Sequence, residues 1–155
     1  MNLRCRSSIL LPLPLLLTFC MPTHASSINE TLPDAQALNL MEQQAQEAKP
    51  REQCFLYTEL VHTMTEIAGK QMLDGNIDQA SATLRKVEHY AELIHLGLAR
   101  DTKRLKNAEL LMHHTTYRLN EYLHQASGED QATLQATLKQ LDNVHNELLS
   151  QVFNH

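Results

Sequence analysis

Apolar side chains recur at alternating intervals of three and four residues over most of the chain beyond residue 33. This spacing places them on one face of an α-helix, because about 3.6 residues make one turn. The longest clear run extends from Ile77 to Leu98. No stretch shows the alternation of apolar and polar side chains that is typical of a half-buried strand. The pattern therefore predicts an all-α protein.

Breaks in the spacing divide the chain into helices. A thin apolar stripe over residues 33–48 predicts a first helix that is loosely docked. Pro50 begins a second run that ends near residue 73, and Gly75 suits the left-handed residue that follows a helix. The last run covers residues 130–152. Because the intervening turns are short, the sequence predicts an antiparallel helical bundle of about four main helices.

Residues 97–102 leave a second architecture open. Gly97 and Asp101 favour a break, yet the apolar spacing continues in phase beyond them as far as Ala126. One helix over residues 77–126 would be roughly 75 Å long at about 1.5 Å per residue. In that alternative, the two flanking helices fold back along the long helix, and its apolar faces need a second chain to cover them.

The first 25 residues have the pattern of a secretory signal peptide. Arg4 and Arg6 precede an apolar run that two prolines interrupt, and small residues, Thr23 and Ala25, occupy the positions expected before a cleavage site. The run is too short and too rich in proline for a membrane helix. We therefore expect an exported protein, either periplasmic or extracellular.

Cleavage at this site would divide the chain into three parts. These are the signal peptide at 1–25, a polar leader at 26–32 and a single helical domain at 33–155. A lipoprotein signal that ends at Cys20 is the alternative, but it would place the bulky Phe19 where a small residue is expected.

Export also changes the charge and the cysteine content. Loss of Arg4 and Arg6 moves the formal charge from −5 to −7, so nucleic acid is not an expected partner. Cys54 is then the only cysteine, which excludes an internal disulfide, and its apolar register predicts a core position. Beyond residue 25, no segment has the length and hydropathy of a transmembrane helix.

A carboxylate followed three residues later by a histidine occurs four times in the sequence. The four copies are ELVH (59–62), ELIH (92–95), EYLH (121–124) and DNVH (142–145). Such pairs share a helix face, as the ligands of carboxylate-bridged di-metal bundles do. At about 100° per residue, however, Glu59 and His62 are predicted on the solvated side of their helix, and the second and third copies do not converge on the core.

The fourth copy is different because His145 is predicted on the apolar face of its helix. In an antiparallel pair of helices joined near residue 127, residues whose numbers sum to about 255 lie level. Glu109 and His113 are then placed beside Asp142 and His145. These four residues are suitable ligands for zinc or copper. The alternative interpretation is a metal-free set of hydrogen bonds or an ion pair at the rim of the bundle.

Leu110, His114 and Tyr117 lie opposite the main apolar face of their helix and predict a second contact surface, for a protein partner or another copy of the chain. The sequence contains no GxSxG, HExxH or glycine-rich phosphate loop, so we expect no enzyme and no catalytic residue.

The expected function is therefore that of an exported helical protein with an interaction or structural role in the cell envelope. Two alternatives remain: a zinc- or copper-binding protein, and a pH-sensitive helical module. In the latter, burial of His145 would disfavour its charged form, so that acid would weaken the packing.

Overall fold

The structure, a computed structural model, describes residues 32–98, 102–126, 128 and 130–154. Within these residues the chain forms five α-helices and no strand. The helices are α1 (Ala35–Glu47), α2 (Pro50–Leu73), α3 (Ile77–Gly97), α4 (Leu105–Gln125) and α5 (Asp130–Asn154). The all-α prediction is confirmed. The predicted signal peptide at 1–25 lies outside the described residues, as does the predicted leader except for Leu32.

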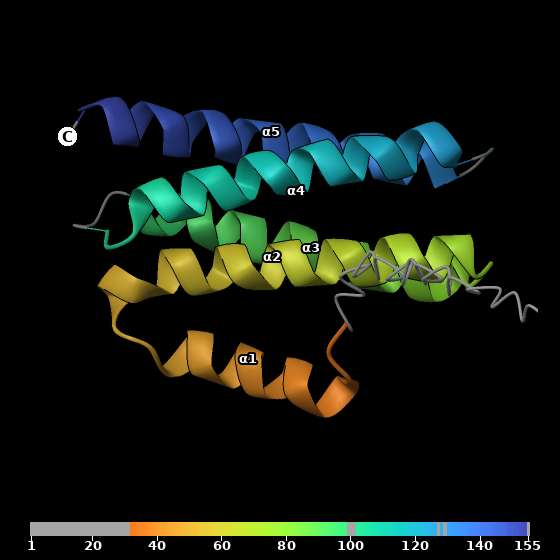
Figure 1. Cartoon of the computed structure of the whole chain (residues 1–155), viewed down its shortest axis with the longest axis horizontal. Coiled ribbons are helices and arrows are strands. Elements are labelled where there is room, and N and C mark those ends of the chain that lie inside the picture. Colours follow the sequence, from red (N-terminus) through yellow and green to blue (C-terminus); the bar gives the residue numbers. More distant parts are fainter. Residues whose placement is uncertain (1–31, 99–101, 127, 129, 155) are drawn as a thin grey trace, which may run out of the picture. The chain divides into compact units, whose positions relative to one another are not determined.

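Helices α2 to α5 form two antiparallel hairpins that pack side by side (Figure 1). α2 pairs with α3 and α4 pairs with α5, while α2 contacts α4 and α3 contacts α5 across the two hairpins. Contacting residues of α2 and α4, such as Glu66 and Arg118, are 52 positions apart. α3 and α5 keep the same offset, as between His95 and Glu147. Since the offset is constant, the two hairpins run in the same direction, and the predicted bundle is confirmed.

The link between α3 and α4 interrupts the long apolar run. α3 ends at Gly97, and α4 begins only at Leu105, after a left-handed residue, Arg104, with φ of 59°. The alternative of one helix over residues 77–126 is therefore wrong. The buried faces of both helices belong to the same core.

This link is attached to the beginning of α2. The backbone amide of Lys103 donates to the carbonyl of Arg51 at 2.8 Å. The guanidinium carbon of Arg104 lies 3.5 Å from the centroid of the Phe55 ring, which is a cation–π contact. The left-handed residue thus places a cation on an aromatic ring of the other hairpin.

The core consists mainly of the apolar positions that the spacing predicted, including Cys54, which is 1% exposed. Its largest fully buried side chains are Leu60, Met64, Leu84, Ile94, Met112, Leu119, Leu134, Leu141 and Leu148. Four threonines are also fully buried: Thr58, Thr65, Thr115 and Thr137. The hydroxyls of Thr58, Thr65 and Thr115 donate to the carbonyl four residues earlier in their own helices. The nearest acceptor of the Thr137 hydroxyl is the Glu88 carboxylate, at 2.8 Å. These polar groups are therefore buried without losing a hydrogen bond.

The apolar face of α5 is rotated from its predicted position. The buried apolar residue at this level is Val144, 3% exposed, and the His145 side chain is 17% exposed at the edge of the helix contact. Leu134, Leu141 and Leu148 are buried as predicted. The prediction that His145 lies on the apolar face is wrong. The buried residues at this level are Leu141, Val144 and Leu148, which are three and four residues apart.

α1 contacts the α2–α3 hairpin through apolar and polar side chains: Leu38 and Met41 pack against the core, and Glu42 pairs with Lys86 of α3 at 2.9 Å. Asp34 caps the first turn of α1 by accepting a hydrogen bond from the amide of Ala37 at 2.8 Å. At the other end, the side-chain amide of Gln53 in α2 donates to the carbonyls of Ala45 and Gln46 at 3.3 and 3.2 Å. Ala45 is the only residue of α1 that is buried. This arrangement agrees with the thin apolar stripe of its sequence.

Gly69 allows a close contact between α2 and α4. A Cβ atom at this position would lie 2.1 to 2.5 Å from three ring carbons of Tyr122. The ring cannot easily move away, because the Tyr122 hydroxyl is hydrogen-bonded to Glu66 and Arg118 at 2.7 Å each. The missing side chain of Gly69 is therefore what allows the Tyr122 ring to lie between the two helices.

We predict that Gly69→Ala lowers the free energy of unfolding by about 1–3 kcal/mol, as expected for overpacking. The matched control is Gly97→Ala in α3, where a new Cβ meets no atom within 4 Å. The control should leave stability unchanged or raise it by up to about 1 kcal/mol, because alanine favours a helix. Urea unfolding of both variants provides the comparison. Equal effects of the two substitutions would contradict this account of the Tyr122 contact.

Candidate functional site

Two of the four predicted metal ligands are in direct contact. Nε2 of His145 in α5 lies 3.2 Å from Oε1 of Glu109 in α4, and the two side chains are 17% and 18% exposed. Because a carboxylate only accepts, the imidazole donates this hydrogen bond. Their residue numbers sum to 254, close to the expected value of about 255. The prediction that Glu109 and His145 lie level with each other in antiparallel helices is therefore confirmed.

The other two predicted ligands lie farther out. His113 and Asp142 are exposed, and the ring of His113 is tilted against that of His145 with 5.2 Å between their centroids. Throughout the described helices, no group of three or more His, Cys, Asp or Glu side chains is arranged to hold a metal ion. The four residues therefore form a polar rim between α4 and α5, and this geometry adds no support to the zinc or copper hypothesis.

The surroundings of His145 differ from those that the pH-sensitive alternative assumed. That alternative required an imidazole surrounded by apolar side chains, whereas this one is partly exposed and hydrogen-bonded to Glu109.

The first copy of the motif, ELVH, lies at a helix contact and not on a solvated face. Nδ1 of His62 lies 3.0 Å from the hydroxyl oxygen of Thr115 in α4. That hydroxyl donates its only hydrogen to the carbonyl of Leu111 at 2.7 Å, so His62 is the donor. Burial raises the pKa of Glu59, and the charge of Arg104 lowers it to a smaller extent. The solvated prediction is wrong because α2 packs against α3 on one side and α4 on another, so it has two buried faces.

The second and third copies take part in local ion pairs. Nδ1 of His95 in α3 donates to Oε2 of Glu147 in α5 at 2.6 Å, and this hydrogen bond raises the pKa of His95. Glu121 accepts a hydrogen bond from Arg118, one helical turn earlier. His124 lies near the carbonyl of Asn120, four residues before it, at 2.7 Å. None of these pairs converges on the core, as predicted.

A polar cluster that the motif search missed joins α2 to α4. Arg118 donates from Nε and Nη2 to the two carboxylate oxygens of Glu66, at 2.8 and 3.0 Å, which is a bidentate pair. The Tyr122 hydroxyl donates to the same carboxylate at 2.7 Å. Burial raises the pKa of Glu66, but these hydrogen bonds and the Arg118 charge outweigh it and hold the pKa below its usual value. Burial and the Glu66 hydrogen bond raise the pKa of Tyr122 to about 12.

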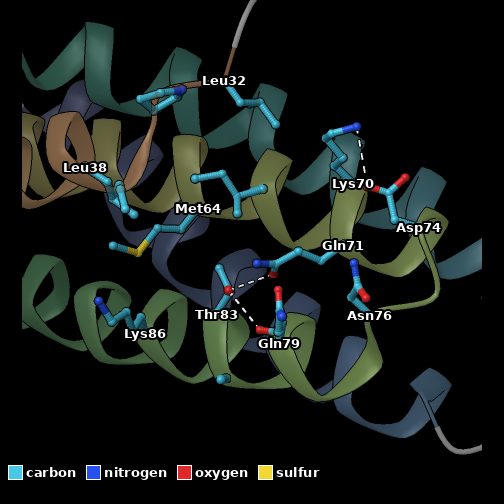
Figure 2. A pocket seen from close by; sticks show the side chains of 14 residues that line it. Leu32, Leu38, Met64, Lys70, Gln71, Asp74, Asn76, Gln79, Thr83 and Lys86 are labelled. Carbon is cyan, nitrogen blue, oxygen red and sulfur yellow. Dashed lines mark hydrogen bonds and ion pairs between the residues drawn. The ribbon is translucent and has the colours of Figure 1, made fainter.

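A hollow of about 510 Å³ lies between the start of α1 and the α2–α3 hairpin (Figure 2). Its wall includes Leu38 from α1 and Met64 from α2. Within it the Thr83 hydroxyl donates to the side-chain oxygen of Gln71 at 2.8 Å. Neither histidine nor cysteine lines the hollow, so it presents no nucleophile or metal ligand of those types. The hollow lies where the first part of α1 meets the hairpin incompletely.

The outer face of α4 carries the residues that were predicted for interaction. Leu110 and Tyr117 are 66% and 59% exposed, and His114 is exposed between them. Beside Leu110 is a hollow of about 590 Å³ that extends to Phe55 of α2. We call Leu110, His113, His114 and Tyr117 together the α4 outer face. Their exposure on one side of the helix agrees with the spacing argument.

Comparison with known proteins gave no match to a family model, a curated protein or a solved structure. None of the helices in the described part of the chain is long and apolar enough to span a membrane. The function of this chain is therefore inferred from its own geometry.

We predict that Glu66→Gln lowers the free energy of unfolding at pH 7 by about 2 kcal/mol, the scale of a hydrogen bond to a charged group. The folded pKa of Glu66 is below its usual value of 4.5, so its stabilisation is complete above that pH and is lost as the pH falls through the folded pKa. The variant should therefore lose less stability than the wild type on acidification below about pH 4.5. Chemical unfolding from pH 7 to 3 measures both effects.

The control is Glu92→Gln, which removes an exposed carboxylate from α3. It should change neither the stability at pH 7 nor the acid profile by more than about 0.5 kcal/mol. Parallel acid profiles for the wild type and Glu66→Gln would contradict the role assigned to Glu66.

Proposed function

We propose that the protein is an exported interaction module that binds a helical protein surface through the α4 outer face and carries out no catalysis. The observation that carries this proposal is that Leu110 and Tyr117 are both exposed, with Leu110 beside an apolar hollow and Tyr117 beside a second, smaller one. Seven residues separate the two side chains, so they lie on the same side of α4. Anchors spaced in this way are typical of helix recognition.

The other large exposed apolar side chains lie elsewhere on the described helices. They are Leu40 in α1, Leu73 and Ile77 at the α2–α3 turn, Leu96 in α3 and Phe153 in α5. Single exposed residues are common on protein surfaces, whereas a contiguous apolar patch is characteristic of a contact site. Leu110 and Tyr117 both lie within α4 and away from its ends. Leu110 borders one hollow and Tyr117 borders another. This contrast favours the α4 outer face.

The state of Cys54 supports a role without catalysis. Burial raises the pKa of its thiol to about 12, whereas a catalytic cysteine requires a lowered pKa and access to its substrate. Arg118 and Tyr122, the other groups whose pKa is strongly displaced, are joined through Glu66 in the contact between α2 and α4. Ionic networks of this kind displace pKa values without any catalytic role.

Export is the second part of the proposal, and the N-terminal pattern of Arg4, Arg6, the apolar run and Ala25 supports it. An interaction module in the cell envelope or outside the cell must remain folded without a disulfide. The continuous apolar core and the satisfied buried threonines provide that stability.

The test is site-specific photo-crosslinking in the cells that produce the protein. A photoreactive amino acid at position 110 should give a defined protein adduct after irradiation, because the proposal places that side chain against a partner. The matched control is position 96, where Leu96 has almost the same exposure, 62% against 66%. Mass spectrometry identifies the adducts. If position 110 gives no more adduct than position 96, the proposed function is wrong.

A further inference from the structure

Along the outer side of α4, residues are arranged about one point so that two antiparallel copies would complement each other; of these, Glu121 is half-exposed and also accepts a hydrogen bond from Arg118 of its own helix. Lys106 near its beginning is matched by Glu121 near its end, Leu110 by Tyr117, and His113 by His114. Each pair is centred on the same point, between residues 113 and 114. Lys106, Leu110 and Tyr117 lie within about 40° of one another around the helix axis, and Glu121 lies about 20° beyond Leu110. One helix side therefore combines opposite charges at its ends, apolar residues nearer its middle and two histidines at its centre.

We propose that the partner of the α4 outer face is a second copy of this chain, with the two α4 helices antiparallel about a two-fold axis between His113 and His114. This inference rests on the proposed function and names the partner. In an antiparallel pair, residues on opposite sides of the axis lie level. Leu110 then faces Tyr117 of the second copy, and Lys106 faces Glu121 of the second copy. A two-fold axis makes every such contact twice.

The charges select the antiparallel orientation. A parallel pair would place Lys106 against Lys106 and Glu121 against Glu121, which brings like charges together. The antiparallel pair brings opposite charges together at both ends of the contact, and such complementarity fixes the register of an interface. This local attraction also acts against the general repulsion between two copies of an acidic chain.

The two hollows beside α4 match the side chains that would reach them. The larger, of about 590 Å³, lies on the α2 side and is bordered by Leu110 and Phe55. The smaller, of about 300 Å³, lies on the α5 side and is bordered by Tyr117 and Leu138. A second α4 that crosses the first obliquely would bring its Tyr117 to the larger hollow and its Leu110 to the smaller. The larger side chain thus meets the larger space at both symmetric positions.

A contact made by one helix from each copy is small. It falls at or below the lower end of the range for specific interfaces, about 1,200 Å² in total. The dimer should therefore dissociate on dilution, and its equilibrium should be accessible to sedimentation of the chain without its signal peptide. We expect wild-type protein to shift from monomer to dimer as its concentration rises.

Leu110→Arg places a charge at the centre of the contact and should raise the dissociation constant by about tenfold or more. The matched control, Leu96→Arg, changes an equally exposed leucine of α3 and should dimerise like the wild type. Circular dichroism establishes that both variants keep their helices. A dimer that Leu110→Arg leaves intact would contradict this interface.

Cysteine pairing tests the orientation. Lys106→Cys and Glu121→Cys are mixed and oxidised, and the proposed dimer predicts a disulfide between the two variants. Either variant alone should form little disulfide, since equivalent positions would be about 22 Å apart along the helices. Cys54 is buried and does not compete. Efficient disulfide formation by each variant alone would show a parallel dimer and overturn the inference.

The failure of this inference can be distinguished from that of the proposed function. Wild-type protein that stays monomeric at every accessible concentration would exclude the second copy as partner. If position 110 nevertheless crosslinks to another protein in cells, the interaction module is retained and only its partner changes. If position 110 crosslinks to nothing, both proposals fail.

Discussion

The contact between α2 and α4 joins the two hairpins, and the rest of the bundle depends on it. Hydrophobic packing alone is not directional, so it would allow the hairpins to slide along each other. The bidentate pair of Arg118 and Glu66 fixes their level, and the Tyr122 ring opposite Gly69 fixes their separation. Both constraints act within one helical turn of α4, and the contact between α3 and α5, which includes the His95–Glu147 pair, keeps the same offset.

This contact also explains why the α4 outer face exists. The buried side of α4 carries Met112, Thr115 and Leu119, all nearly or fully inaccessible. With α2 and α5 on its two flanks, the remaining side must point away from the core. Leu110 and Tyr117 are therefore held outside by the same packing that orders the bundle, and their exposure does not depend on a mobile segment.

Much of the fold could be predicted from the sequence because helix formation depends on local spacing. Pro50, Gly75 and the apolar run that follows each of them were enough to give both ends of α2 and the beginning of α3. The break after Gly97 was harder to predict, because the residues on both sides keep one spacing and the contacts of Lys103 and Arg104 with α2 are not visible in it. Those contacts join positions about fifty residues apart, so they cannot be inferred from the local spacing of apolar residues.

The candidate site was predicted less completely for a similar reason. Helix register placed Glu109 level with His145, and helical phase placed Leu110 and Tyr117 outside. The prediction for His62 was wrong because one-sided amphipathicity was assumed for a helix that has two neighbours. Glu66 and Arg118 carry no motif, since each is an ordinary charged residue on its own helix and their pairing exists only after the hairpins meet.

Because contacting residues of the two hairpins keep a constant offset, the α4–α5 hairpin repeats the α2–α3 hairpin beside it in the same direction. α1 lies beside α2 on the side away from α4, so the α2–α3 hairpin has neighbours on both sides (Figure 1). The α4–α5 hairpin has the α2–α3 hairpin on one side and no corresponding cover on the other within the described helices. In stacked helical-repeat proteins, each repeat contacts its neighbours and the terminal repeats need a polar outer face to remain soluble. By that criterion α1 covers one end of this short stack, and at the other end the exposed Leu110 and Tyr117 interrupt a surface that is otherwise mainly polar.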